Sequence, residues 1–147
     1  MNDLRIATAQ FEHRDGDKAY NLARVETLTR RAVEAGAQIV SFHEGCIPGY
    51  SWIQPLEKSQ LLEVAEPVPD GGSVQKLIEI ARRHQLVVMA GLLERDEDDH
   101  VYNCYVTVGP DGYITRFRKI HPFVNPQLSP GDEYNVIDLL GCKIGFL

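Results

Sequence analysis

Two charged side chains in this chain of 147 residues stand where they could carry out acid–base chemistry. Glu44 follows the apolar segment 37–42, which has the character of a buried strand. A carboxylate at the carboxyl edge of a parallel sheet can accept a proton from a bound group. Lys119 directly follows a second predicted strand, residues 113–118, and its ammonium could stabilise a developing oxyanion.

Each of these residues also has a simpler interpretation. Glu44 could be a solvated loop glutamate. Lys119 belongs to a short basic cluster with Arg116, Arg118 and His121, and such a cluster is typical of a solvated strand end. The functional hypothesis therefore requires that Glu44 and Lys119 meet in space.

A nucleophile would complete such a site, but none of the three cysteines is well placed for the part. Cys46 lies on the same loop as Glu44, Cys104 lies inside a predicted strand and is expected in the core, and Cys142 precedes the last strand. A nucleophile is normally presented by a strand-to-helix turn. The odd number of cysteines and their spacing indicate reduced thiols in a cytoplasmic protein.

Composition excludes several classes of function. With 44% hydrophobic and 24% charged residues the chain has the balance of a folded globular protein. Its net charge of −6 disfavours nucleic acid and anionic membranes as partners. We see no membrane-spanning run, no signal peptide and no metal-binding motif, and we expect no cofactor. The link at 10–18 lacks a glycine-rich phosphate loop, which disfavours a nucleotide-binding domain.

The elements that must position Glu44 come first in the chain. Residues 4–9 are predicted to form a buried strand, and residues 18–35 an amphipathic helix that ends at Gly36. Residues 37–42 then form a second buried strand. This order predicts the start of a parallel sheet with a right-handed crossover.

The elements that must position Lys119 come later. The acidic stretch 94–99 is expected to be a solvated turn, and Ser73 fits the N-cap of a helix. The class is α/β with a mixed sheet in one domain, 1–147. In order, the remaining expected elements are a loop at 43–55, helices at 56–64 and 73–84, a buried strand at 86–92, a hairpin of strands 101–108 and 113–118 around the turn 110–112, a loop at 125–132, and strands at 134–139 and 143–147.

Five segments in this order resemble the nitrilase superfamily of carbon–nitrogen hydrolases. They cover most of the chain, and the ordered set is far more specific than any one motif. The segments are LRIATAQ (4–10), IVSFHEGCIPGY (39–50), VYNCYVTVGPDGYITRFRKIHPF (101–123), SPGDEYNVID (129–138) and GCKIGFL (141–147).

The resemblance implies a function and a fold. It implies that Glu44 is the general base, that Lys119 stabilises the tetrahedral intermediate, and that the family's nucleophilic cysteine falls just beyond Leu147. The substrate would be a small amide or nitrile, attacked by cysteine and released through a thioester. The fold would be an α-β-β-α sandwich, incomplete in this chain, which forms a homodimer through its helices. The chain ends at 144–147 within an apolar strand that we expect to be buried, which also indicates a longer parent protein or a strand completed by a neighbouring chain.

The chain departs from the family pattern at two places. His43 stands where a proline usually precedes the glutamate, and the loop after Lys119 lacks the second acid that many members carry. Tyr50 and Trp52 could line a substrate cleft, or they could simply pack their loop. A non-catalytic subunit or binding module that kept the scaffold is therefore the alternative hypothesis.

Overall fold

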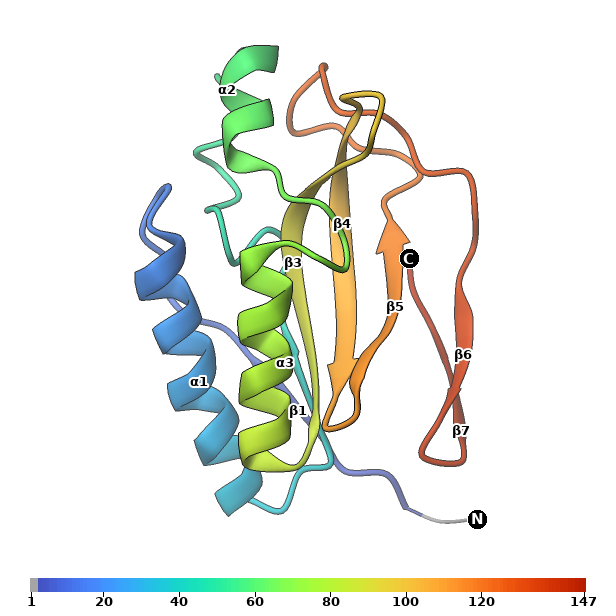
Figure 1. The fold of residues 1–147 in the computed structure, drawn as a ribbon. Coiled ribbons are helices and arrows are strands. Elements are labelled where there is room, and N and C mark those ends of the chain that lie inside the picture. Colours follow the sequence, from blue (N-terminus) through green and yellow to red (C-terminus); the bar gives the residue numbers. More distant parts are fainter. Residues whose placement is uncertain (1–2) are drawn as a thin grey trace.

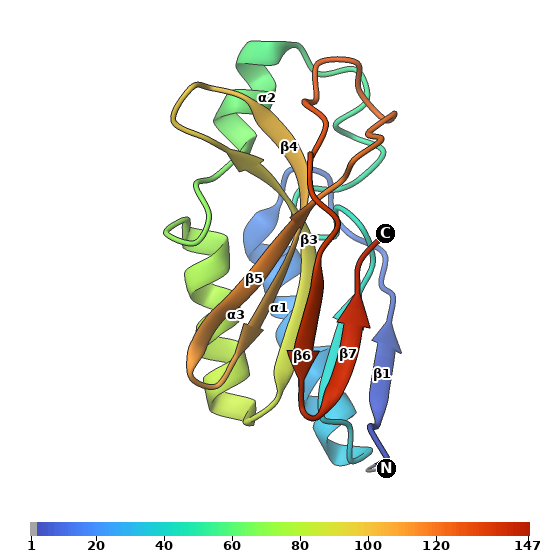
Figure 2. The same ribbon diagram turned by 90° about the vertical axis from the view of Figure 1, so that its right-hand side faces the viewer.

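The fold is a layered arrangement of helices and strands, seen here in a computed structural model that describes residues 3–147. Helices α1 (Lys18–Glu34) and α3 (Gly72–His84) lie side by side on one face of a five-stranded sheet (Figure 1). A two-stranded hairpin covers part of the other face (Figure 2). The order of layers is therefore α-β-β, and none of the described helices is both long and apolar enough to cross a bilayer.

Helix α1 forms because its ends are capped and one side is suited to burial. The Asp17 side chain accepts a hydrogen bond from the Tyr20 N–H at 2.9 Å, which satisfies a free donor of the first turn. Gly36 follows the helix with φ +76°, a left-handed conformation that glycine adopts without strain, as the sequence predicted. The buried side consists of Asn21, Val25, Thr29 and Ala32.

Helix α3 begins at Gly72, and its N-terminus is capped differently from the prediction. The sequence favoured Ser73 as the N-cap, but Ser73 lies within the helix. The Glu66 carboxylate accepts bonds from the Ser73 N–H and hydroxyl, both at 2.7 Å, and from Lys18 Nζ at 2.5 Å. Burial raises the pKa of Glu66, but these bonds lower it more, so the net pKa lies below its ordinary value.

The sheet has the mixed topology that the sequence predicted. Its strand order is β1-β2-β3-β4-β5, with β1, β2 and β3 parallel and β3, β4 and β5 antiparallel. The short helix α2 (Lys58–Val64) lies between β2 and α3 in the chain. The bounds are β1 (Ile6–Ala9), β2 (Ile39–Phe42), β3 (Val87–Arg95), β4 (Val101–Gly109) and β5 (Gly112–Arg118).

The second β layer is the hairpin of β6 (Val136–Leu139) and β7 (Cys142–Gly145). It packs on the sheet through a cluster that includes Phe117 and Phe146, whose rings stack with centroids 6.3 Å apart. Burying aromatic surface in this way holds the hairpin against the sheet. The helices pack on the opposite face through a larger cluster that includes Val25, Leu77 and Val88.

Three expectations about burial were wrong. The first strand is half-exposed and lies at the edge of the sheet, with Ile6 49% exposed. The last strand is also partly exposed, and Leu147 lies at the surface. Glu94 is not part of a solvated turn, because β3 continues to Arg95 and the Glu94 side chain is buried.

Candidate active site

Glu44 leaves the sheet in a tight turn directly after β2. Gly45 has φ +60°, and the turn lies flat on Gly91 of β3, where an added Cβ would be 2.3 Å from the Gly45 nitrogen. Gly91 also accepts a hydrogen bond from the Ile47 N–H at 3.1 Å. The absence of a side chain at residue 91 thus allows the Glu44 turn to approach the sheet closely.

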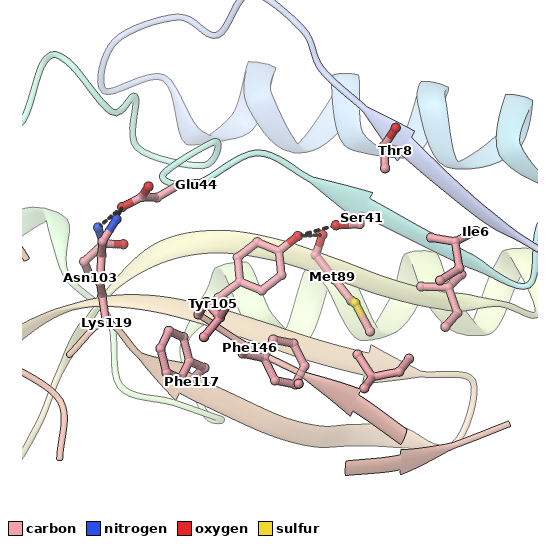
Figure 3. Close-up of a pocket in the computed structure, with 14 residues that line it drawn as sticks. Ile6, Thr8, Ser41, Glu44, Met89, Asn103, Tyr105, Phe117, Lys119 and Phe146 are labelled. Atoms are coloured by element: carbon pink, nitrogen blue, oxygen red, sulfur yellow. Dashed lines mark hydrogen bonds and ion pairs between the residues drawn. The ribbon is translucent and has the colours of Figure 1, made fainter. Parts of the chain in front are cut away.

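Lys119 approaches Glu44 on the same face of the sheet, from the end of β5. It follows β5 immediately, and its N–H donates to the Asn103 carbonyl at 2.8 Å, which continues the ladder with β4. Lys119 Nζ lies 2.8 Å from Glu44 Oε1. The predicted meeting of Glu44 and Lys119 is therefore confirmed, and Figure 3 shows the two side chains converging.

Asn103 is a third member of this group. Its side chain is almost fully buried, and its Nδ2 donates to Glu44 Oε1 at 2.5 Å (Figure 3). Both donors use the same carboxylate oxygen, so Oε2 is not needed for either bond. A carboxylate fixed through one oxygen can present the other to a reacting proton.

The three side chains sit at one end of a cavity of about 370 Å³. Glu44 is 39% exposed and Lys119 is 27% exposed, so both are accessible yet partly shielded from water. The other walls are mostly apolar and include Met89, Tyr105, Phe117 and Phe146 (Figure 3). A charged pair at the end of an apolar cavity is the usual composition of a small-molecule site.

Tyr105 lies in the wall of this cavity, and its hydroxyl group holds the end of β2 in place. It donates to the Phe42 carbonyl at 2.6 Å and lies 2.8 Å from Ser41 Oγ. Burial raises the pKa of Tyr105 to about 12, so the hydroxyl stays protonated. These contacts fix the backbone two residues before Glu44.

The two aromatic residues proposed for substrate contact lie in different places. Tyr50 packs against Gly45, and its pKa is raised by burial and further by the negative charge of Glu44, so Tyr50 lies near the Glu44 carboxylate. Trp52 lies against Gly16, where an added Cβ would be 3.2 Å from Trp52 Cη2. Neither Tyr50 nor Trp52 is among the residues that line the cavity beside Glu44, and the contact of each with substrate stays a prediction.

None of the three cysteines, all within residues 3–147, lines this cavity. Cys46 is fully buried, and burial raises its pKa to about 12. Burial also raises the pKa of Cys104 well above its ordinary value, with the Glu94 carboxylate adding to the effect. A protonated, buried thiol is a poor nucleophile. Among residues 3–147 no group of three or more His, Cys, Asp or Glu could hold a metal ion.

Sequence reasoning had not selected Asn103 as a site residue. The available signal was a polar residue within a mostly apolar strand, VYNCYVTV, since a buried amide must find a hydrogen-bonding partner. The partner could not be read from the strand, because Glu44 lies 59 residues away in the sequence.

Comparison with known sequences gives the family of the chain. The model of the carbon–nitrogen hydrolase family matches residues 5–147. A nitrilase of Pyrococcus abyssi is 31% identical over 147 residues, covering 98% of this chain and 55% of the relative. An (R)-stereoselective amidase of a Pseudomonas species is 33% identical, covering 98% and 50%. The omega-amidase of Mus musculus is 31% identical, covering 99% and 54%.

Solved structures share the fold. An amidase from a Nesterenkonia species superposes with a TM-score of 0.77 at 20% identity, covering 97% of this chain and 54% of that one. The chain spans about half the length of the curated relatives it matches. The mixed sheet and the order of layers are consistent with the family match, which covers nearly all residues. The chain belongs to the carbon–nitrogen hydrolase family.

Proposed function

We propose that residues 1–147 supply the base and the stabilising cation of a hydrolase that acts on a small amide or nitrile. The observation that carries this proposal is the junction at Glu44 Oε1, where Lys119 Nζ and Asn103 Nδ2 converge at 2.8 and 2.5 Å. The family membership and the names of the relatives, which are amidases and nitrilases, support the same reaction class.

In the proposed mechanism Glu44 takes the proton of a cysteine thiol, and the sulfur attacks the carbonyl carbon of the amide. The Lys119 ammonium stabilises the negative charge that develops on the carbonyl oxygen. Glu44 then gives its proton to the leaving nitrogen, so that ammonia departs and a thioester forms. Water attacks the thioester while Glu44 accepts a proton from the water. The carbon–sulfur bond then breaks, Glu44 returns the proton to the sulfur, and the carboxylic acid and the free thiol are released.

The nucleophile in this proposal comes from outside residues 1–147. None of the three cysteines of these residues lies at the cavity, and the relatives are about twice as long as this chain. We place the cysteine in a segment that follows residue 147 in the whole protein. The domain formed by residues 1–147 is then part of a larger hydrolase unit.

The alternative is a non-catalytic module that keeps the scaffold. Its support is the lack of a cysteine at the cavity among the described residues. The reading frame after codon 147 separates the two proposals. A cysteine on a strand-to-helix turn within the next thirty or so codons favours the hydrolase, whereas a stop codon at that point favours the module.

Ammonia release from a panel of small amides and nitriles tests the function. We expect turnover by the protein expressed from its complete gene and none by residues 1–147 alone. Turnover by residues 1–147 that survives Glu44→Ala would contradict the assignment of the base.

We also propose that the chain self-associates in a reducing, cytoplasmic environment. Large exposed side chains such as Phe123 and Tyr134, each 77% exposed, and the unpaired edge of β1 support association. The three free thiols support a reducing compartment. Size-exclusion chromatography showing a monomer at high concentration would contradict association.

A further inference from the structure

The buried carboxylate of Glu94 lies on the opposite face of the sheet from the candidate active site. Its side chain is 1% exposed, which is rare for a glutamate unless the charge is paired. Two arginines of β5 supply the pairing. Arg118 donates from Nη2 to Oε1 at 2.7 Å and from Nε to Oε2 at 3.0 Å, and Arg116 Nη1 lies 2.7 Å from Oε1.

These contacts span three strands. Glu94 is on β3 and the arginines are on β5, so the ion pairs cross over β4. Tyr102 of β4 packs against this pair, with its ring centroid 3.8 Å from the Arg118 guanidinium carbon. We call Glu94, Arg116, Arg118 and Tyr102 the Glu94 staple. A bidentate pair between an arginine and a carboxylate fixes the relative position of the two strands that carry them more tightly than a single hydrogen bond does.

Each donor to Glu44 is the sequence neighbour of a staple residue. Asn103 follows Tyr102 on β4, and Lys119 follows Arg118 at the end of β5. Successive side chains in a strand point to opposite faces. The staple on the helix face therefore stands directly behind the two groups that reach Glu44 on the cavity face.

The end of β5 needs such a support. Among the strands of residues 3–147, β5 is an edge strand that pairs with β4 alone, and the ends of edge strands open most readily. Beyond Arg118 the backbone is held by the Lys119 N–H to Asn103 bond at 2.8 Å and by the Gly131 N–H to Lys119 carbonyl bond at 2.9 Å. A displacement of this segment by about 1 Å is enough to break the hydrogen bond between Lys119 and Glu44.

We infer that Glu94, acting through Arg118, is a positioning residue that holds Lys119 and Asn103 against Glu44. The contact between Glu44 and Lys119 is a matter of geometry, whereas the catalytic meaning of the contact rests on the proposed function. The test therefore measures the contact itself and not turnover.

A water-soluble carbodiimide provides the measurement on the 147-residue chain. It converts the Glu44 carboxyl group into an O-acylisourea, the free amine of Lys119 attacks the acyl carbon, and a urea leaves. The product is an amide between the two side chains, formed with the net loss of one water, and peptide mass spectrometry quantifies it. Only groups already in contact react in this way, as Lys119 Nζ and Glu44 Oε1 are at 2.8 Å.

We expect the wild-type chain to form this amide and Glu94→Gln to form roughly tenfold less, because intramolecular reactions depend steeply on placement of the reacting atoms. Arg118→Lys keeps the positive charge but cannot form the bidentate pair with both Glu94 oxygens, so the yield of the Glu44–Lys119 amide should also fall. The matched control is Glu97→Gln, which removes an exposed carboxylate just after β3 and should leave the yield unchanged.

Circular dichroism well below the melting temperature checks that each variant is folded. If Glu94→Gln does not fold, the amide yield of Arg118→Lys tests the positioning role in its place. A role in stability alone would lower the melting temperature without changing the yield. Wild-type yield in a folded variant would overturn the positioning role. A wild-type chain that forms no Glu44–Lys119 amide would overturn the contact on which the inference stands.

Discussion

Replacing Gly91 by alanine tests whether the close approach of the Glu44 turn to β3 sets the geometry of the site. The added Cβ would lie 2.3 Å from the Gly45 nitrogen and 2.9 and 3.0 Å from the Glu44 carbonyl carbon and Cα. All three are backbone atoms, so no side chain can rotate away to make room. The turn itself must move.

The size of the movement follows from these distances. Ordinary van der Waals contact begins at 3.4 Å, so the Gly45 nitrogen must retreat by about 1.1 Å (3.4 minus 2.3). If the Glu44 carboxylate moves with the turn and directly away from a fixed Lys119, its 2.8 Å bond lengthens to about 3.9 Å, which is no longer a hydrogen bond. Overpacking of this kind costs about 1–3 kcal/mol of stability. A misplacement of 1 Å can lower a reaction rate by about a hundredfold.

Urea unfolding measures the loss of stability, and ammonia release by the protein from the complete gene measures the loss of rate. Gly72→Ala is the matched control, because the nearest atom to its Cβ is 3.9 Å away and the same methyl group is added. A Gly91→Ala protein with wild-type stability and wild-type turnover would show that the turn does not depend on this contact.

Three further predictions concern single groups. Tyr105→Phe removes the bond to the Phe42 carbonyl and should cost about 1–2 kcal/mol in urea unfolding; no loss would mean that the hydroxyl is not needed to hold β2. Burial raises the pKa of Glu66 but its hydrogen bonds lower it more, so its folded pKa lies below the ordinary value of a glutamate; its stabilisation is present above that ordinary value and is lost as pH falls through the folded pKa. Glu66→Gln should therefore be less stable than wild type at pH 7, with the difference shrinking as the pH falls through the folded pKa, and a difference independent of pH would contradict this. Iodoacetamide at pH 8 should label the partly exposed Cys142 before Cys46, whose pKa burial raises to about 12, and mass spectrometry showing the reverse order would refute the burial argument.

The order of helices and strands along the chain could be predicted because it depends on residues that are close together in the sequence. The order of apolar strand, amphipathic helix ended by Gly36 and second apolar strand predicted the parallel pairing of β1 and β2. The Pro-Asp-Gly turn at 110–112 predicted the hairpin of β4 and β5. The meeting of Glu44 and Lys119 followed from their places at strand ends together with the family resemblance.

The parts that escaped prediction depend on contacts between distant strands. Glu94 lies in a run of acidic residues that is typical of a solvated turn, and only the arginines of β5, more than twenty residues away, allow its burial. Asn103 was missed for the same reason, because its place in the site depends on the hydrogen bond that it donates to the distant Glu44. The N-cap of α3 was misassigned because the capping carboxylate, Glu66, comes from outside the helix.

The most direct test of the central claim is ammonia release by the protein from the complete gene, compared among four variants. Glu44→Gln and Lys119→Gln should each abolish turnover while leaving the fold intact by circular dichroism. Glu97→Gln and Lys143→Gln make the same changes of charge at exposed positions and should retain turnover. Turnover that persists without the Glu44 carboxylate or the Lys119 ammonium would contradict the account.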